Sequence, residues 1–331
     1  MNPIKSLLGR HLLAFLVSTS FFIGIFLGLI VLDVFGGKNC ESDFKFINPE
    51  PDCEIFERKT SKMESLQTEL EVEIDGYLEK KKADRISVFA RDLVSKKFVG
   101  VGENDMFVMA SLLKLPLAIA YFKLAEVNPE LISKKTNYTG TENLYDIQDI
   151  QPQEKLVVGN DYSIEELLYH ALVYSDNTAA EILSKNFVSY DYFQKILYAI
   201  GLLIKKDERN EDLVTARSYA NLFRILYNSS YLTREYSDKI LSMLSKSNFV
   251  DGAAAKLPKD TIISHKFGER TIYDEKTNQP IARQLHDCGI VYAKNGKEPY
   301  IFCIMTQGKN FPDLELIIQN ISETIYDTIA D

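Results

Sequence analysis

The stretch "MASLLKLPLAIAYF", Met109 to Phe122, places a lysine inside an apolar run that reads as a buried helix. Burying an ammonium group is costly unless a partner stabilises it or it gives up its proton. Ser111 stands three residues before Lys114, and side chains at that spacing leave a helix from the same face. Packing alone does not explain a serine and a lysine side by side in such a helix.

A serine beside a buried lysine is an arrangement that can make a nucleophile. A serine hydroxyl reacts poorly until a base takes its proton, and a lysine becomes that base when burial lowers its pKa toward neutrality. Ser111, near the start of the helix, also has backbone N–H groups free to bind an oxyanion. Pro116 lies close enough to the helix start to be tolerated. The pattern S-x-x-K is too short to decide a function by itself.

Two further short motifs follow along the chain. Ser175, Asp176 and Asn177 form S-D-N, and Lys266 and Gly268 form K-x-G on an apparent strand. S-x-x-K, S-D-N and K-x-G, in that order, are the motifs of class A β-lactamases and penicillin-binding proteins.

The chain resembles that family well beyond the motifs, over about residues 63–331. Three longer stretches resemble its nucleophile helix, its second motif with the approach helix, and its closing hairpin: "FVMASLLKLPLAIAYF" (107–122), "GNDYSIEELLYHALVYSDNTAAEIL" (159–183) and "GIVYAKNGKEPYIFCIMTQG" (289–308). The resemblance implies a serine hydrolase that needs no cofactor.

The resemblance also implies a role for each matching residue. Ser111 would be the acylated nucleophile, and Lys114 would accept its proton. Ser175 would pass a proton to the leaving nitrogen, and Asn177 would hold Lys114 and the substrate amide. Lys266 would supply positive charge near Ser175 and the substrate carboxylate.

The same resemblance assigns backbone groups. The N–H groups of Ser111 and Glu269 would form the oxyanion hole, with Gly268 beside them against the substrate. Asp176 would turn its side chain into the fold. The alternative for the S-D-N residues is an ordinary N-cap or turn cluster.

Two departures from the family pattern put substrate range and turnover in question. Phe267 stands where the family usually has Thr or Ser, which removes a hydroxyl that would contact the substrate carboxylate. The interval 186–219 looks short and holds no E-x-x-x-N, so the glutamate that activates the deacylating water in class A enzymes has no clear counterpart. Glu208 and Glu211 are the acidic candidates there, and each is more simply a solvated loop charge. An insertion, "RTIYDEKTNQPIARQLH" (270–286), should lengthen a strand connection at the rim of the cleft.

Hydrophobic periodicity predicts an α+β domain of three layers. Strands at both ends bracket a helical middle, so we expect one antiparallel sheet built from both ends of the domain, with helices on its faces. A capping box of Ser163 and Glu166 should begin one of the middle helices. The expected elements are a helix over 63–82, strands within 85–93 and 96–102, a helix-rich middle over 109–245, strands within 261–269, 287–295 and 299–308, and a helix from Asp313 onward.

The N-terminus predicts a membrane anchor. Residues 12–32 form a run of 21 without a charge, long enough to cross a bilayer as a helix. Lys5 and Arg10 precede the run, so residues 1–11 should stay cytoplasmic and the rest should be extracytoplasmic. A cleavable signal peptide is the alternative, but its apolar core is usually about 7–15 residues long and ends in an A-x-A-like site, which is lacking after Leu32. Residues 33–62 read as a stalk before a hydrolase domain over 63–331.

The four cysteines are read in two pairs. Cys40 and Cys53 lie in the stalk and could close a small loop. Cys288 and Cys303 flank a hairpin, in which a two-residue Asn295-Gly296 turn would place them opposite one another. Pro299 argues against that register because it would lose a ladder hydrogen bond, so we expect both thiols to be free and packed.

Composition narrows the partners. The chain has 331 residues, 46% of them hydrophobic, which is enough for a large core. A net charge of −9 and a pI near 5.2 argue against nucleic acid, which would require a basic stripe. No Cys/His spacing resembles a zinc site, so we expect no metal.

These observations lead to a ranked set of functions. We expect a single-pass membrane protein whose extracytoplasmic domain recognises penicillins and hydrolyses β-lactams through an acyl-enzyme on Ser111. A peptidase for D-Ala-D-Ala-type cell-wall peptides and a slow-deacylating penicillin-binding protein share the same acylation step. A non-catalytic binding or sensor domain that keeps the pocket is the alternative of another class.

Overall fold

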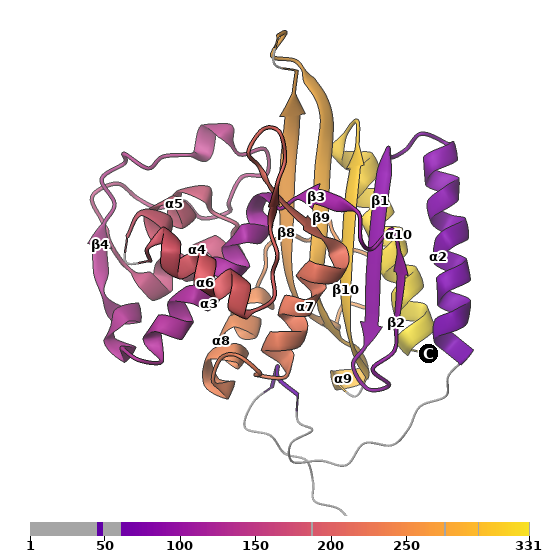
Figure 1. Cartoon of the computed structure of the whole chain (residues 1–331), viewed down its shortest axis with the longest axis horizontal. Helices are drawn as coiled ribbons and strands as arrows, with labels where there is room; N and C mark the ends of the chain where they lie inside the picture. The colour runs from indigo at the N-terminus through magenta and orange to yellow at the C-terminus, as the bar shows by residue number, and fades with distance from the viewer. Residues whose placement is uncertain (1–44, 49–60, 187, 275, 297, 331) are drawn as a thin grey trace, which may run out of the picture. The chain divides into compact units, whose positions relative to one another are not determined.

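The computed structural model describes residues 45–48, 61–186, 188–274, 276–296 and 298–330, which belong to one unit with a five-stranded antiparallel sheet (Figure 1). The strand order is β2-β1-β10-β9-β8, so the N-terminal strands β1 and β2 pair with the C-terminal strands through β10 and complete one sheet. This confirms the expected α+β architecture. The strands are β1 (Arg85–Asp92), β2 (Phe98–Val101), β8 (Ile262–Tyr273), β9 (Pro280–Tyr292) and β10 (Glu298–Gly308).

Helices cover both faces of the sheet, as the sequence predicted. The helices α2 (Ser61–Glu79) and α10 (Phe311–Ala330) lie side by side on one face (Figure 1). The helical middle of the chain lies on the other face and comprises α3 (Lys114–Ala125), α4 (Ile164–Val173), α5 (Asn177–Lys185), α6 (Tyr190–Ala199), α7 (Ala216–Tyr227) and α8 (Arg234–Leu244). The short elements are 3₁₀ turns η2 (Ala110–Leu113), η3 (Pro129–Ser133) and η4 (Tyr145–Ile147), the turn α9 (Ala293–Gly296), and strands β3 (Met106–Val108), β4 (Lys135–Asn137), β5 (Asp161–Ser163), β6 (Lys205–Lys206) and β7 (Asp212–Thr215).

Strand β10 shows why the sheet separates two hydrophobic cores. Successive side chains of a strand point to opposite faces. Ile301, Cys303 and Met305 accordingly pack with the helical middle, whereas Phe302 and Ile304 pack with α2 and α10. Because both faces are covered, this strand is apolar along its length rather than alternating.

Helix starts follow their capping residues. The Ser163 side chain accepts a hydrogen bond from Glu166 N, and the Glu166 carboxylate accepts one from Ser163 N at 2.7 Å, so the predicted capping box begins α4. Thr215 caps α7 in the same way, with its hydroxyl accepting from Ser218 N. These caps fix where the helices that surround the site begin.

Part of the predicted stalk packs against the domain. Phe46 and Ile47 are buried in the core beneath the helical middle. The Tyr292 hydroxyl donates to the Phe46 carbonyl at 2.9 Å, and Asn48 N donates to the Tyr227 carbonyl at 2.6 Å. Residues 45–48 therefore belong to the folded unit.

The predicted cytoplasmic tail (1–11), the membrane segment (12–32), and Cys40 and Cys53 lie outside the described residues. Within the residues that the structure does describe, no helix is long and apolar enough to cross a membrane.

The insertion at 270–286 extends a hairpin. β8 and β9 stay paired from Ile262 opposite Tyr292 out to Tyr273 opposite Pro280. Figure 1 shows this hairpin projecting beyond the other strands. The added residues therefore lengthen the two strands that border the helical layer.

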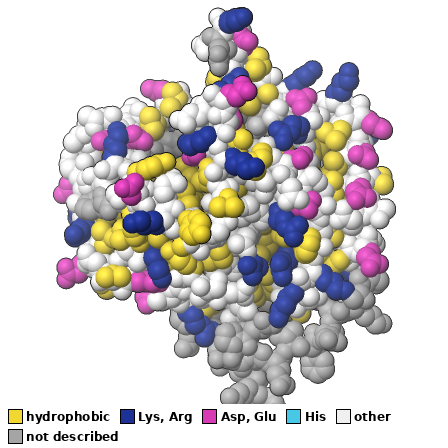
Figure 2. Space-filling view, viewed as in Figure 1, with side chains coloured by type: hydrophobic (Ala, Val, Ile, Leu, Met, Phe, Trp, Pro, Cys, Tyr) yellow, Lys and Arg dark blue, Asp and Glu magenta, His cyan; other side chains and the backbone are white. Residues whose placement is uncertain are grey.

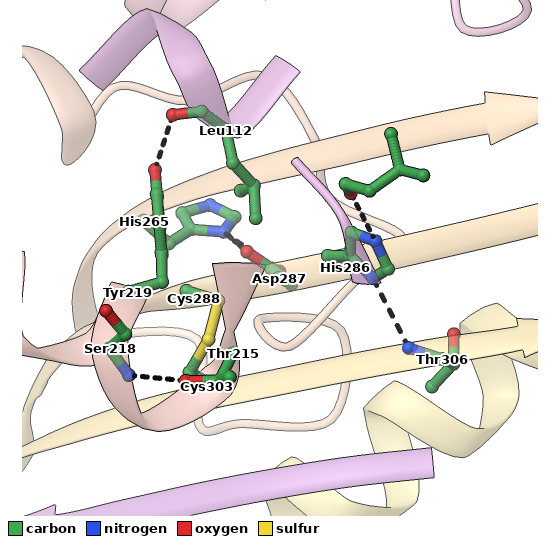
Figure 3. Close-up of a disulfide and its surroundings, with 11 residues drawn as sticks. Leu112, Thr215, Ser218, Tyr219, His265, His286, Asp287, Cys288, Cys303 and Thr306 are labelled. Atoms are coloured by element: carbon green, nitrogen blue, oxygen red, sulfur yellow. Dashed lines mark hydrogen bonds and ion pairs between the residues drawn. A yellow bond between two sulfur atoms is a disulfide. The ribbon is translucent and has the colours of Figure 1, made fainter. Parts of the chain in front are cut away.

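Cys288 and Cys303 form a disulfide, so the prediction of two free thiols is wrong (Figure 3). They lie directly opposite each other in the β9–β10 ladder. Pro299 does not disturb this register, because its carbonyl accepts a hydrogen bond from Leu93 N, beyond the end of β1, at 3.0 Å. The N–H and C=O of one strand residue point to the same side, so the N–H that proline lacks would not have faced β9. The strands connect through α9 rather than through a two-residue turn.

The disulfide leads to a prediction about stability. Replacing both Cys288 and Cys303 with alanine should lower the free energy of unfolding by about 2–4 kcal/mol, because the unfolded chain regains the freedom that the cross-link removes. Urea unfolding with and without reductant measures the effect. Reductant should destabilise the wild type more than the double-alanine variant, which keeps Cys40 and Cys53. A wild type that responds to reductant no more than the variant does would contradict the disulfide.

Candidate active site

The Lys114 amine is the centre of the candidate site. Its Nζ donates to Ser111 Oγ at 2.7 Å and to Asn177 Oδ1 at 2.6 Å. It also lies 2.5 Å from the Ser175 carbonyl oxygen and 3.2 Å from Ser175 Oγ. The first two motifs therefore meet at one nitrogen atom. Lys114, which carries it, is buried, with 6% of its surface exposed.

The third motif reaches the same cluster through Ser175. Lys266 Nζ donates to Ser175 Oγ at 2.7 Å and to the Phe267 carbonyl at 2.9 Å. Ser175 Oγ therefore lies between two amines, and both Ser175 and Lys266 are fully buried. All five residues that we predicted as catalytic are joined in one hydrogen-bonded chain.

The local fold around Ser111 is a strained turn followed by a helix. Ala110, just before Ser111, has φ +47°, a left-handed conformation that costs energy in a residue with a Cβ. The 3₁₀ turn η2 then carries Ser111, and α3 begins at Lys114, which leaves Pro116 in the first helical turn, where it is tolerated. The Tyr219 hydroxyl of α7 donates to the Leu112 carbonyl at 2.9 Å and holds this turn from below (Figure 3).

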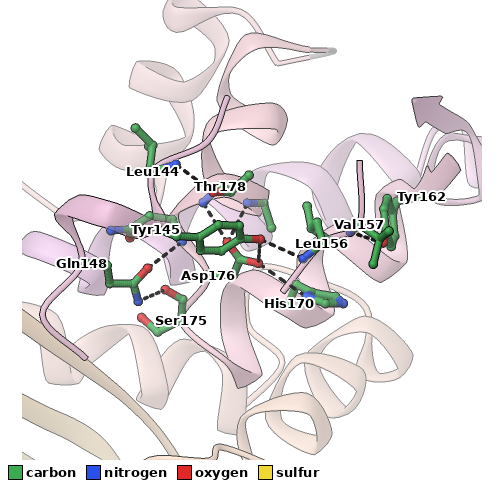
Figure 4. Close-up of polar contacts among 12 residues, drawn as sticks. Leu144, Tyr145, Gln148, Leu156, Val157, Tyr162, His170, Ser175, Asp176 and Thr178 are labelled. Atoms are coloured by element: carbon green, nitrogen blue, oxygen red, sulfur yellow. Dashed lines mark hydrogen bonds and ion pairs between the residues drawn. The ribbon is translucent and has the colours of Figure 1, made fainter. Parts of the chain in front are cut away.

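Asp176 fixes the second motif from inside the fold, as predicted. It is the N-cap of α5, and its carboxylate accepts from Thr178 N at 2.8 Å and from Ala179 N at 3.1 Å. The Tyr145 hydroxyl donates to the same carboxylate at 3.0 Å (Figure 4). Ser175 before it has φ +54°, so a second left-handed residue stands at the site. The alternative of an N-cap therefore describes Asp176 correctly. The side chains on either side of it, Ser175 and Asn177, instead contact Lys114.

Gln148 is a site residue that the sequence analysis missed. It is buried, and its Nε2 donates to the Ser175 carbonyl at 3.0 Å, while its Oε1 accepts from Asn177 N at 3.3 Å (Figure 4). It therefore supports the same residues that hold Lys114. No local pattern marks Gln148, because its partners lie 27 and 29 residues later.

Burial sets the protonation of Lys114. Desolvation lowers the pKa of Lys114 to about 7, against a smaller opposing effect of the Asp176 and Glu269 charges. The pKa of Lys266 is also lowered well below its usual value, first by burial and then by the nearby Lys114. A neutral Lys114 amine can accept the proton of Ser111 to which it is hydrogen-bonded.

A cavity of about 530 Å³ opens beside this cluster. Ser111, Lys114, Asn177 and Glu269 line it, whereas Ser175, Lys266 and Gly268 do not. On the face shown in Figure 2, apolar side chains gather between the helical layer and the sheet, with charged side chains of both signs around them. The nucleophile and the amine therefore face a space that can admit a small substrate.

Gly268 sets how closely β8 approaches the nucleophile turn. A Cβ at this position would lie 3.0 Å from Leu112 Cγ and 3.1 Å from the Met109 carbonyl oxygen. Glycine therefore lets β8, the strand that carries Glu269, lie against the η2 turn, which carries Ser111. The predicted oxyanion pair thus comes from two adjoining elements.

Phe267 is a core residue. It is 1% exposed and its ring stacks on Phe249 with a centroid distance of 4.3 Å. Lys266 Nζ lies 4.3 Å from the centroid of the same ring, within cation–π range. Phe267, which replaces the usual Thr or Ser, thus packs strand β8 against the core and provides no hydroxyl group at this position.

The two glutamates that we considered for deacylation are placed poorly for it. Glu208 is exposed and does not line the cavity; it lies in a separate hollow with Arg209 and Lys276. Glu211 lines the cavity but forms an ion pair with Arg270. Glu208 and Glu211 therefore lie near residues of the β8–β9 hairpin, and neither is free beside Ser111.

A buried hydrogen bond between a histidine and an aspartate supports β8 next to Lys266. His265 Nδ1 lies 2.8 Å from Asp287 Oδ1, and Asp287 Oδ2 accepts from Ala253 N at 2.9 Å (Figure 3). Neither side chain lines the cavity. Within the described part of the chain, no group of three or more His, Cys, Asp or Glu side chains is arranged to hold a metal ion.

Comparison with known proteins agrees with this geometry. Residues 69–329 match the model of the beta-lactamase enzyme family. Beta-lactamase VEB-1 of Pseudomonas aeruginosa is 26% identical over 278 residues, which cover 77% of this chain and 88% of that protein. The structure of TLA-1 extended spectrum beta-lactamase superposes with a TM-score of 0.69 at 21% identity, covering 82% of this chain and all of that one. PBP-A, in an acyl-enzyme complex with penicillin G, superposes with a TM-score of 0.64 at 19% identity, covering 80% and 96% of the two chains.

The lowered pKa of Lys114 leads to a prediction about stability. Between pH of about 7 and about 10 the unfolded chain holds a proton on this lysine that the folded protein lacks, so folding stability should rise with pH in that window. Lys114→Met removes the titrating group, so the stability of the wild type minus that of Lys114→Met should increase as pH rises. Urea unfolding at several pH values measures the difference. A difference that stays constant would mean that the folded and unfolded states have the same lysine pKa.

Proposed function

Because this chain belongs to the beta-lactamase enzyme family and is a class A-like serine hydrolase, we propose that it recognises penicillins and hydrolyses β-lactams through an acyl-enzyme on Ser111. The observation that carries the proposal is the 2.7 Å hydrogen bond between Lys114 Nζ and Ser111 Oγ at the edge of the cavity.

Acylation follows from the contacts of Lys114. The neutral amine takes the proton of Ser111 while Oγ attacks the carbonyl carbon of the β-lactam. The backbone N–H groups of Ser111 and Glu269 would stabilise the negative charge on the carbonyl oxygen. Asn177 keeps the amine in place through its 2.6 Å contact.

Proton delivery to the leaving nitrogen follows from Ser175. Its Oγ is 3.2 Å from Lys114 Nζ and 2.7 Å from Lys266 Nζ, so a proton accepted by Lys114 can pass along this chain. Lys266 is fully buried, so its effect on the substrate would act through Ser175 rather than by direct contact.

Two related activities share this acylation step. A peptidase acting on D-Ala-D-Ala-type cell-wall peptides would use the same residues, and a slow-deacylating penicillin-binding protein would differ only in how water is activated. A binding domain without turnover would not need a lysine with a lowered pKa against the serine. The assembled amine and hydroxyl favour an enzyme.

We also place the protein in the membrane, on the sequence alone. The uncharged run at 12–32, preceded by Lys5 and Arg10, supports a single-pass anchor with the hydrolase domain extracytoplasmic. Penicillins and cell-wall peptides are met on that side.

Ser111→Ala tests the nucleophile. The variant should form no covalent adduct with benzylpenicillin and show no turnover, because no other hydroxyl in the chain of contacts faces the cavity. Its melting temperature should stay within about 2 °C of the wild type, since removing one half-exposed hydroxyl has little effect on stability. Intact-protein mass spectrometry measures the adduct, and an adduct on the variant would refute the assignment.

A topology reporter tests the anchor. Alkaline phosphatase fused after residue 331 should be active, because this enzyme folds only in an oxidising extracytoplasmic space. Replacing Lys5 and Arg10 with glutamate should reduce that activity by weakening the positive-inside bias. An inactive fusion beside an active cytoplasmic reporter at the same position would exclude the proposed orientation.

A further inference from the structure

The cavity carries more carboxyl groups than the acylation step uses. Five side chains of this kind line it: Asp149, Glu181, Glu211, Asp212 and Glu269. Hydrolysis of a Ser111 ester requires a group that takes a proton from water, and a carboxylate can do so when it is basic enough and faces the reacting carbon. The question is which of the five is free to act.

Three of the five are committed to cations. Glu181 forms an ion pair with Lys185 at 2.9 Å, and Asp212 forms one with Lys206 at 2.7 Å. Glu211 pairs with Arg270. Because a cation already holds each of these carboxylates, we set all three aside as candidates for binding a reacting water molecule.

Glu269 differs in its partners. Its Oε1 accepts a hydrogen bond from Ile150 N at 3.1 Å, and its carboxyl group is also hydrogen-bonded to the Asp149 side chain. No lysine or arginine among the described residues forms an ion pair with it. Asp149 beside it is exposed and accepts from the Thr271 hydroxyl at 2.6 Å. Glu269 is therefore a half-buried carboxyl group of the cavity that hydrogen bonds hold in place and that has no cation partner to neutralise its charge.

Glu269 lies on β8 just beyond the point where this strand meets the nucleophile turn. Gly268, the preceding residue, lies so close to the η2 turn that a Cβ would be 3.3 Å from Leu112 N. Glu269 is thus the first β8 residue beyond that contact, and it lines the same cavity as Ser111. A water molecule held by its carboxylate would approach a Ser111 ester from the side of β8.

The electrostatic surroundings suit proton transfer near neutral pH. The titratable groups that interact with Glu269 are Asp149 from the loop after η4, Lys114 from α3 and Lys266 from β8 itself. Burial, reinforced by Asp149 and opposed by Ile150 N and Lys114, raises the pKa of Glu269 to about 7. A base is most efficient when its pKa lies near the working pH.

We propose that the Glu269 carboxylate is the general base that hydrolyses the Ser111 acyl-enzyme, in place of the loop glutamate that the sequence lacks. The carboxylate takes a proton from water as the water oxygen bonds to the ester carbonyl carbon. The tetrahedral intermediate then collapses, the bond between carbon and Ser111 Oγ breaks, and Glu269 returns the proton to Oγ. The product leaves as a carboxylic acid, and the free serine is regenerated. This proposal rests on the proposed function and completes its second half.

The test compares formation and loss of the adduct in the full-length protein, purified in detergent. The variants are Glu269→Gln, Glu269→Asp and, as a matched control, Glu181→Gln, whose carboxylate lines the cavity but pairs with Lys185. Benzylpenicillin and the activated ester p-nitrophenyl acetate both serve as acylating probes, with quench-flow mass spectrometry following the adduct. Thermal unfolding establishes that each variant is folded.

Glu269→Gln should acylate within about threefold of the wild type, because the backbone N–H of residue 269 is retained, and should lose its adduct about 10²–10⁴-fold more slowly. Glu269→Asp should fall between the two, and Glu181→Gln should match the wild type. In the wild type the rate of adduct loss should rise with pH through about 7, and this dependence should vanish in Glu269→Gln.

Adduct loss from Glu269→Gln at the wild-type rate, or with the wild-type pH profile, would overturn the assignment of Glu269 and leave the acyl-enzyme function standing. A wild type acylated by the ester but not by benzylpenicillin would overturn the β-lactam substrate, while the ester adducts still decide the role of Glu269. A folded wild type that forms no adduct with either probe would refute both proposals.

Discussion

The burial of the Lys114 amine is the constraint on which the rest of the site depends. An ammonium in an apolar helix is unstable unless acceptors surround it or its proton leaves, and the protein uses both solutions. Ser111, Ser175 and Asn177 supply acceptors within 3.2 Å, and desolvation lowers the pKa of the amine to about 7. The same burial that makes the charged lysine costly leaves its amine largely unprotonated near neutral pH, so that it can accept the proton of the serine nucleophile.

The fold brings three distant segments to that amine. The η2 turn and α3 supply the serine and the lysine from the helical layer, and the start of α5, capped by Asp176, supplies Ser175 and Asn177. β8 supplies Lys266 from the outermost position of the sheet, where it borders the helical layer. Gly268 lets this strand press against the turn. The sheet is assembled from both ends of the domain, so the site forms only when the whole domain has folded.

Sequence reasoning succeeded where the relation is local or carried by motifs. Ser111 and Lys114 are one helical turn apart, so their contact follows from spacing, and the S-D-N and K-x-G residues were placed by resemblance. Gln148 was missed because it supports residues far along the chain and has no local pattern. The disulfide was missed because the sequence does not show that the backbone of Pro299 faces the β1 side of β10 rather than β9. That orientation follows from the strand pairing alone. Glu269 was noted for its backbone alone, since nothing in the sequence reveals that its side chain lacks a cation partner while Glu181, Glu211 and Asp212 have one.

The protonation of Lys114 can be measured directly. Growing the protein with lysine that carries ¹³C at the ε-carbon allows NMR to follow the titration of each lysine side chain. Comparison with the spectrum of Lys114→Met identifies the resonance that belongs to Lys114. The account predicts that this resonance titrates near pH 7, well below an ordinary lysine. A Lys114 resonance that titrates near pH 10 would contradict it, because a lysine that stays charged at neutral pH cannot take the proton of Ser111.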